Sequence, residues 1–180
     1  MALDHRTLDR VPIFAPNIMN TTALYDEGLQ QFLDAFSFDR LVQVGGVSGA
    51  PHVKREVSKD LLVDGYGCQY QYRGVGLPYC TYSPLTAAET VADVEAFDWP
   101  DPDACGQVEA HVRETARTAA DQGDYATAVS LPPLFHQYHY LRGFEQWMID
   151  IKLYPAVHEA ISMHIHHIQM TVLMRLLDQV

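Results

Sequence analysis

The chain has 180 residues, 48% of them hydrophobic and 19% charged, which is typical of one globular domain and not of a disordered segment. Its formal net charge of -11, with only 12 lysines and arginines, argues against nucleic acid and anionic membrane as partners, because both need a cationic face. No apolar run approaches the roughly 20 residues that span a bilayer.

Turn residues and apolar periodicity predict alternating strands and helices in the first part of the chain. We expect a strand over Val11 to Ala15, a helix from Thr21 or Thr22 to about Phe36, and a second strand from Arg40 to Val44. The glycines that follow predict a turn. Because G-x-G-x-x-G and the lysine of a phosphate-binding loop are both absent, a nucleotide site is not expected.

The middle of the chain predicts a β-hairpin excursion and two helices. Polar and aromatic residues alternate around four glycines between Leu61 and Tyr82, as in a hairpin. A helix is expected from Thr86 to Phe97, since Thr86 precedes Glu89 by three residues in capping-box register. Gln107 to Ala120 has the one-sided apolar pattern of a second helix.

The segment from Tyr125 to Leu153 predicts a strand, a loop and an amphipathic helix. In an α/β barrel, the loops after the carboxyl ends of the strands form the active face. The expected loop carries four candidate site residues: His136, Tyr138, His139 and Tyr140. At the start of the helix, Arg142 and Glu145 are expected to form an ion pair, and Asp150 to order the helix.

The last predicted helix begins at Pro155 and runs to the end of the chain. Its expected buried stripe is Val157, Ile161, Ile165, Ile168 and Val172. Of the histidines beside this stripe, only His164 and His167 lie close enough around a helix to share a metal ion. No third ligand is apparent, so we assign no metal site and expect polar flanks of a packing helix.

The three cysteines, Cys68, Cys80 and Cys105, form no C-x-x-C pair, and the first residues lack the pattern of a secretory leader. This usage predicts a reducing, cytoplasmic setting. Cys68 is expected to be a small buried side chain. The alternative, a reactive thiol, requires nearby positive charge that lowers its pKa.

Four segments occur in the order of a known set of motifs: ALDHRTLDRVPIF with D-R-V-P at Asp9 to Pro12, VDGYGCQY with Asp64, Tyr66 and Gly67, TAAETVADVEAFDWPDPDA, and LRGFEQWMID. Together they resemble the uroporphyrinogen decarboxylase-like superfamily, which includes tetrapyrrole decarboxylases and corrinoid-linked methyltransferases. The resemblance implies an α/β fold, the N-terminal half of a (β/α)8 TIM barrel with a β-hairpin excursion, in which residues 1-180 form one partial domain.

Members of that superfamily are about twice this length. An open half-sheet exposes unpaired strand edges, so the resemblance implies either a homodimer or a complementary C-terminal half as partner. It leaves open whether this chain is an enzyme by itself.

Three departures from the decarboxylase pattern favour the methyltransferase-related branch. The segment after the first strand, Asn17 to Thr21, lacks the arginines of R-Q-A-G-R. VQVGGVSG replaces F-S-D-I-L, and LPPLFHQYHYLRG places His139 where G-A-P-F-T-L-x-x-Y has its tyrosine. The methyltransferase branch implies a zinc site and a corrinoid partner in the complete enzyme. The alternatives are uroporphyrinogen decarboxylase, a carboxy-lyase of porphyrin biosynthesis that needs no cofactor, and a non-catalytic half-barrel that binds a partner chain or a tetrapyrrole.

The resemblance and the predicted loop give one set of candidate residues for a pocket that takes a small molecule, a tetrapyrrole or a corrinoid. The expected catalytic residues are His139, Tyr140, His136 and Asp64. The expected substrate-binding residues are Tyr138, Tyr66 and Asn17. For His139 and Tyr140 the alternative is simple aromatic packing.

Overall fold

The computed structural model describes residues 50–73, 77–104 and 131–179, two short strands outside these ranges, and single helical positions among residues 28–31 and 110–121. The first predicted strand and Asn17 lie outside the described residues. The helix expected from Thr21 or Thr22 to about Phe36 is described only at Gly28 and Gln31, and both positions are helical. The helix expected from Gln107 to Ala120 is described only in part, and its described positions are helical.

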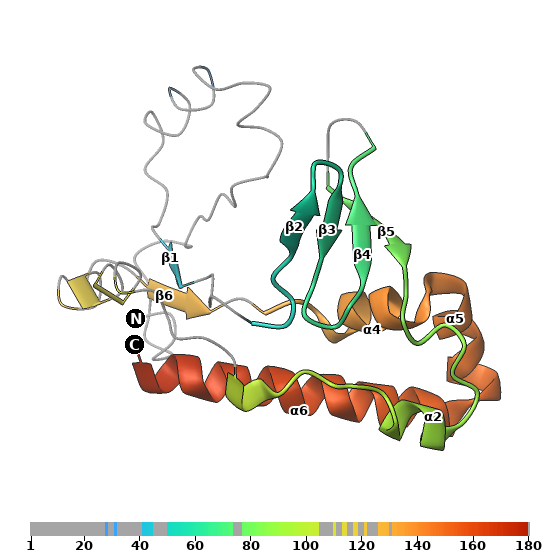
Figure 1. Ribbon diagram of the computed structural model, residues 1–180. Helices are drawn as coiled ribbons and strands as arrows, with labels where there is room; N and C mark the ends of the chain where they lie inside the picture. The colour runs from blue at the N-terminus through green and yellow to red at the C-terminus, as the bar shows by residue number, and fades with distance from the viewer. Residues whose placement is uncertain are drawn as a thin grey trace.

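Two strands far apart in the sequence form a parallel pair, β1 (Leu41–Val44) and β6 (Ala126–Val129). Leu41 lies opposite Ala126 and Val44 opposite Val129. Both strands were predicted, and both are confirmed. A parallel pair needs a long crossover connection, and this one includes a complete antiparallel sheet. The chain is therefore mixed α/β, and Figure 1 shows the pair beside the sheet and helices.

The predicted hairpin excursion is a four-stranded antiparallel sheet. Its order is β2 (Arg55–Ser58), β3 (Leu61–Val63), β4 (Gln69–Gln71) and β5 (Tyr79–Tyr82). The expectation was right about the antiparallel pairing but wrong about the extent, because the sheet begins six residues before Leu61. All four residues of β2 are exposed, so this edge strand has no apolar alternation to reveal it. A polar edge also discourages pairing with other chains.

The helix predicted from Thr86 is shorter and begins later. Helix α2 is Val91–Glu95, and its capping box pairs Thr90 with Asp93. Thr86 instead donates its hydroxyl to the carbonyl of Ser83, at 2.8 Å, within a turn. The carboxylate of Asp93 accepts from the backbone N–H of Thr90 at 2.8 Å. The predicted box with Glu89 was wrong because an equally spaced pair, four residues on, satisfies the free N–H groups of the helix.

The predicted loop after β6 is helical, which corrects the placement of four candidate residues. Helix α4 is Leu134–Arg142, and only the four residues 130–133 connect it to β6. The two prolines of that connection favour a helix start, and this signal outweighs the aromatic content that suggested a loop. Gly143, at a φ of +87°, separates α4 from α5 (Phe144–Leu153). A side chain would strain this backbone conformation.

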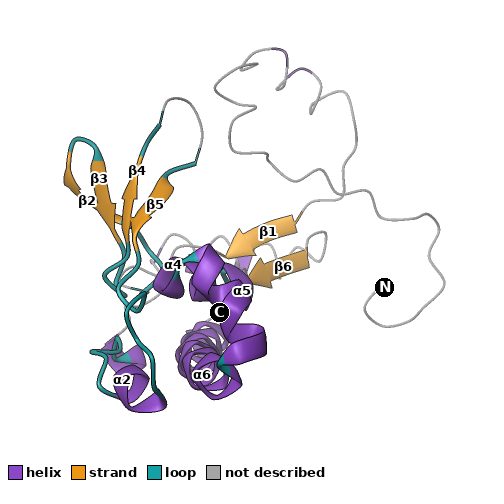
Figure 2. Cartoon of the chain, turned by 90° about the vertical axis from the view of Figure 1, so that its right-hand side faces the viewer, coloured by secondary structure: helices purple, strands orange, loops and turns teal. Residues whose placement is uncertain are grey.

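The final helix, α6 (Pro155–Gln179), begins and packs as predicted. All five residues of its expected stripe are buried. The stripe joins one core with α4, α2 and the sheet, through residues such as Leu141, Val94 and Tyr70. In Figure 2, α4 and α5 lie between the sheet and α6, with α2 beside α6. Within the part of the chain that the structure describes, no helix is long and apolar enough to cross a bilayer.

Candidate ligand site on helix α4

One face of α4 carries a cluster of aromatic and imidazole rings. The ring centre of His139 lies 4.3 Å from that of Tyr140, and the His136 ring lies 6.1 Å from Tyr140 with 28° between the ring planes. Phe135 adds contacts to His139 at 4.9 Å and to Trp147 of α5 at 4.7 Å. Helical spacing of three and four residues places these side chains together. Three predicted site residues therefore share one partly exposed face.

Lys54 lies over the inner end of this cluster. Its Nζ is 4.0 Å from the ring centre of Tyr70 on β4 and 5.4 Å from that of Tyr140. The two tyrosine rings meet edge to face, with centres 5.3 Å apart. An ammonium group is attracted to the faces of aromatic rings, so the tyrosines hold Lys54 in place. The result is a cation over two tyrosine rings, one of which, Tyr140, also contacts two histidines.

Asp64 lies beneath these two tyrosine rings, and its carboxylate accepts three hydrogen bonds. Its Oδ1 accepts from the backbone N–H groups of Tyr66 and Cys68, each at 3.0 Å. Its Oδ2 accepts from the Tyr70 hydroxyl at 2.7 Å. Asp64 is buried, so its predicted contact with a ligand would have to pass through Tyr70. In this structure its carboxylate orders the β3 to β4 turn and fixes the tyrosine that carries Lys54.

Burial shifts the pKa values of two groups at this site. Burial lowers the pKa of Lys54, an effect that the negative charge of Asp64 partly opposes. Burial also lowers the pKa of His139, and the neighbouring His136 lowers it further, against a hydrogen bond to the Phe135 carbonyl. Neutral imidazole can both donate and accept, whereas ammonium only donates. The face thus offers aromatic rings, an imidazole that can donate or accept, and an ammonium that donates.

Tyr138 and Tyr66, the two other expected binding residues, both lie in the core. Tyr138 points away from the α4 face and donates its hydroxyl to Asp150 at 3.2 Å. Tyr66 packs edge to face against Trp99, with ring centres 6.4 Å apart. Both side chains are buried, so a role in direct ligand contact has no geometric support here.

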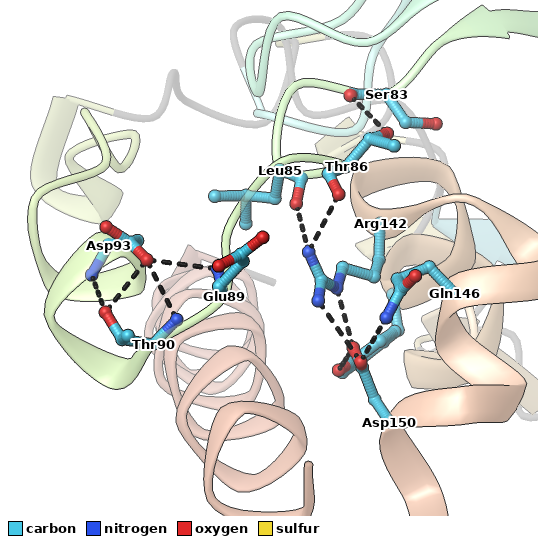
Figure 3. Close-up of polar contacts among 10 residues, drawn as sticks. Ser83, Leu85, Thr86, Glu89, Thr90, Asp93, Arg142, Gln146 and Asp150 are labelled. Atoms are coloured by element: carbon cyan, nitrogen blue, oxygen red, sulfur yellow. Dashed lines mark hydrogen bonds and ion pairs between the residues drawn. The ribbon is translucent and has the colours of Figure 1, made fainter. Parts of the chain in front are cut away.

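Arg142 and Asp150 form a buried ion pair that joins α4, α5 and the loop before α2 (Figure 3). The guanidinium donates Nε and a terminal NH2 to the two carboxylate oxygens, at 2.6 and 3.1 Å. Its other terminal nitrogen donates to the carbonyls of Leu85 and Thr86. The predicted pairing of Arg142 with Glu145 was therefore wrong, whereas the ordering role of Asp150 is confirmed.

The pKa of Asp150 is lowered by this network. Burial alone would raise it, but the hydrogen bonds from Arg142, Gln146 and Tyr138, with the arginine charge, outweigh that effect. Two-pronged contact between guanidinium and carboxylate is among the strongest polar interactions in proteins. The pair is structural, since both side chains are almost completely buried.

The α6 histidines pack in the manner expected of polar flanks. The ring of His164 stacks on Trp99 at 4.5 Å, and its Nε2 lies 3.1 Å from a carboxylate oxygen of Glu95. No three His, Cys, Asp or Glu side chains among the described residues are arranged to hold a metal ion. His164 and His167 thus have no third ligand in this part of the chain.

Cys68 is fully buried, which confirms the sequence-based expectation. Burial raises the pKa of its thiol far above the usual range, and the nearby Asp64 raises it further. We expect Cys68 in the native chain to react with a thiol reagent at least about 100-fold more slowly than in denaturant, because the thiolate is the reactive form and is excluded. Mass spectrometry of labelled peptides measures this site by site. Labelling of native Cys68 as fast as that of the half-buried Cys80 would contradict the expectation.

The fold thus brings together some of the site residues that the sequence predicted, but not all of them. His136, His139 and Tyr140 lie together, Asp64 joins them through Tyr70, and Asn17 lies outside the described residues. Lys54 was missed by sequence reasoning. No protein-family model, no curated protein and no solved structure matches the chain.

Proposed function

We propose that the chain is the N-terminal half of a uroporphyrinogen decarboxylase-like barrel and belongs to a corrinoid- or tetrapyrrole-linked methyltransferase-type enzyme. The proposal rests on the four ordered segments that resemble that superfamily. The parallel β1 and β6 pair is the kind of strand pairing such a barrel contains, and β6 is followed within a few residues by the ring-lined α4.

The structural observation that supports the proposal is the position of Lys54 over Tyr70 and Tyr140, since Tyr140 also contacts the rings of His136 and His139. A tetrapyrrole or corrinoid is a large ring system with polar side groups. Aromatic side chains stack on such a ring, and an ammonium donates to a carboxylate. The described residues do not supply a zinc site, so no step of the proposed chemistry is assigned to a metal held by them.

Two alternatives are separated by specific residues. Decarboxylation of a tetrapyrrole requires arginines that form bidentate hydrogen bonds with the substrate carboxylates. The segment at Asn17 that would supply them has none. The second alternative is a non-catalytic half-barrel that binds a partner chain or a tetrapyrrole, and this would keep the α4 site while lacking turnover.

The test is equilibrium binding of two probes, uroporphyrin and cobalamin, followed by visible absorbance and by quenching of tryptophan fluorescence. Trp147 lies against Phe135 at the edge of the cluster, so a bound ring should quench it. We expect Lys54→Gln to weaken binding about tenfold or more, because a charged hydrogen bond contributes about 1.5 to 3 kcal/mol.

Lys59→Gln is the matched control, since Lys59 is exposed five residues further along the chain. Equal affinities for Lys54→Gln and the parent chain would rule out the α4 site. Tighter binding of cobalamin than of uroporphyrin supports the methyltransferase branch, and the reverse order supports the decarboxylase alternative.

A further inference from the structure

Helix α6 carries an exposed apolar face in addition to its buried stripe. Four large apolar side chains of this helix are 40 to 60% exposed, and three of them are methionines: Met163, Met170, Met174 and Leu177. Ala156 and Ala160 extend the same side of the helix toward its start, because all six residues follow one another in steps of three, four or seven. We call these six residues the α6 face. Methionine is flexible and polarisable, which suits it to contact with varied apolar partners.

An acidic segment, residues 89–104, lies along one side of the α6 face. Its helix α2 contacts α6 near the start, and its short 3₁₀ helix, η1 (Pro102–Ala104), contacts α6 near the end (Figure 1). The ring nitrogen Nε2 of His164 lies 3.1 Å from a carboxylate oxygen of Glu95, and Arg175 donates to the backbone carbonyl of Asp103 at 2.6 Å. The segment contains no lysine or arginine and six exposed acidic residues: Glu89, Asp93, Glu95, Asp98, Asp101 and Asp103. Arg175 offsets the charge of Asp103, and the border of the α6 face keeps a net negative charge.

Near the start of α6 this border closes into a groove. Helices α2 and α6, which lie side by side in Figure 2, line it together, and its volume is about 670 Å³. Ala156, Ala160 and Met163 give it apolar walls, while Glu95 of α2 and Glu159 of α6 add a carboxylate from each helix. No lysine or arginine lines the groove within the described part of the chain. Such a groove is complementary to an apolar surface that carries positive charge.

We propose that the α6 face binds a basic amphipathic helix of a partner protein. The apolar side chains of that helix lie on the methionines, and its lysines or arginines lie beside the acidic segment and Glu159. The α6 face is about 30 Å long from Ala156 to Leu177, which is the length of a helix of about 20 residues. An amphipathic helix in an apolar groove is a common mode of peptide recognition. The proposal concerns a different helix from the α4 ligand site and does not depend on the proposed function.

Charge selects this partner over an acidic one. The chain has a net charge of -11, and the carboxylates beside the α6 face would repel an acidic helix. The α6 helix of a second copy falls in that class, since its own exposed acidic residues are Glu159 and Asp178. A basic helix places opposite charges together, which also speeds its association.

The test is binding of a fluorescein-labelled model helix, LKKLLKLLKKLLKL, to the full chain, followed by fluorescence anisotropy. We expect the dissociation constant to rise at least about tenfold between about 50 and 500 mM salt, because salt screens exposed charges. The same peptide with glutamine at every lysine position should bind at least about tenfold more weakly at low salt. Equal affinities for the two peptides, or no binding of the lysine peptide by about 100 µM chain, would overturn the proposal.

A double variant tests whether the peptide lies on the α6 face. Met163→Lys/Met170→Lys should raise the dissociation constant at least about 100-fold, because it removes apolar contacts and sets like charges against the peptide. Met148→Lys/Ile151→Lys makes the same change of charge at two exposed residues of α5, and should alter the constant less than about threefold. Circular dichroism verifies the helix content of both variants. Equal losses would mean that the peptide responds to net charge and not to the α6 face.

A second pair of variants tests the carboxylates of the groove. Glu95→Gln/Glu159→Gln should weaken binding of the lysine peptide about tenfold at low salt. Glu114→Gln/Glu145→Gln removes two exposed carboxylates elsewhere in the chain and is the matched control, which should bind like the parent chain. If both variants bound equally, the groove would not be where the positive charges lie.

Sedimentation without peptide separates this partner from a second copy of the chain. We expect the parent chain and Met163→Lys/Met170→Lys to have the same mass in solution. A parent dimer that the variant dissociates would assign the α6 face to a second copy and contradict the proposal.

Discussion

Replacing Arg142 with alanine should lower the free energy of unfolding by about 3 to 5 kcal/mol, which is the usual cost of leaving one charge of a buried ion pair without its partner. The change removes the two guanidinium N–H donors to Asp150 and the donor to the carbonyls of Leu85 and Thr86. It therefore weakens the connections among α4, α5 and the loop before α2 at once. Urea denaturation followed by tryptophan fluorescence measures the effect.

Arg175→Ala is the matched control. Arg175 forms an ion pair with Asp103, but both of these side chains are substantially exposed. Surface pairs contribute about 0 to 1 kcal/mol, so this variant should be close to the parent chain. If Arg142→Ala and Arg175→Ala lowered the free energy of unfolding equally, burial would add nothing to the Arg142–Asp150 pair. The structural role given to that pair would then be wrong.

A double-mutant cycle tests whether Arg142 and Asp150 act on each other directly. Each single alanine variant leaves an unpaired buried charge, whereas the double variant leaves none. We expect the double variant to lose clearly less than the sum of the two single losses. Additive losses would mean that the two side chains stabilise the fold independently.

The identity of this ion pair shows what local sequence could and could not predict. Arg142 and Glu145 have the spacing of a helical pair, which is why they were expected to meet. Gly143 adopts a positive φ between them and ends α4, so Arg142 and Glu145 belong to different helices. The change of direction brings Asp150, eight residues from Arg142, to its guanidinium. The Arg142–Asp150 pair depends on the backbone angle at Gly143, so the spacing of the two residues in the sequence does not predict it.

Strong periodicity predicted other parts of the fold correctly. The α6 stripe, its start at Pro155 and strands β1 and β6 were all expected from apolar pattern and turn residues. Local polar signals were less reliable, since Thr86 and Thr90 each begin a plausible capping box and the second is the one that forms. The sequence alone cannot rank two equivalent caps, because their local energies are similar.

Lys54 is the part of the candidate site that no local pattern could reveal. It touches Tyr70, sixteen residues on, and Tyr140, eighty-six residues on. Only the packing of the antiparallel sheet on α4 brings these three side chains together. The sequence identified the aromatic and imidazole rings of α4 as candidates, whereas Lys54 could be identified only from the structure.

Replacing Asp64 with alanine should cost about 3 kcal/mol or more. The change leaves three buried donors without an acceptor: the N–H groups of Tyr66 and Cys68 and the hydroxyl of Tyr70. Each unsatisfied donor costs about 1 to 3 kcal/mol. Asp64→Asn keeps an acceptor oxygen of the same shape and should cost only about 1 kcal/mol. If both variants lost the same amount, the carboxylate would not be the acceptor that orders this turn.

The pH dependence of Asp64→Asn carries the sharper test. Burial raises the pKa of Asp64 in the fold, and hydrogen bonds from Tyr70 and the two backbone N–H groups only partly oppose this. An acid whose folded pKa exceeds its unfolded value, about 3.9, stabilises the fold most when protonated. Its contribution is lost as the pH rises from the unfolded to the folded pKa.

Asparagine does not titrate, so the stability of Asp64→Asn relative to the parent chain should rise as the pH increases through that window. Asp150, whose pKa is shifted downward, contributes the opposite slope, but it is present in both chains and cancels in the difference. Denaturation of both chains at a series of pH values measures the difference directly. A difference that falls with rising pH would mean that Lys54 and the three donors outweigh burial, and that Asp64 is held as a carboxylate beneath the proposed ligand site.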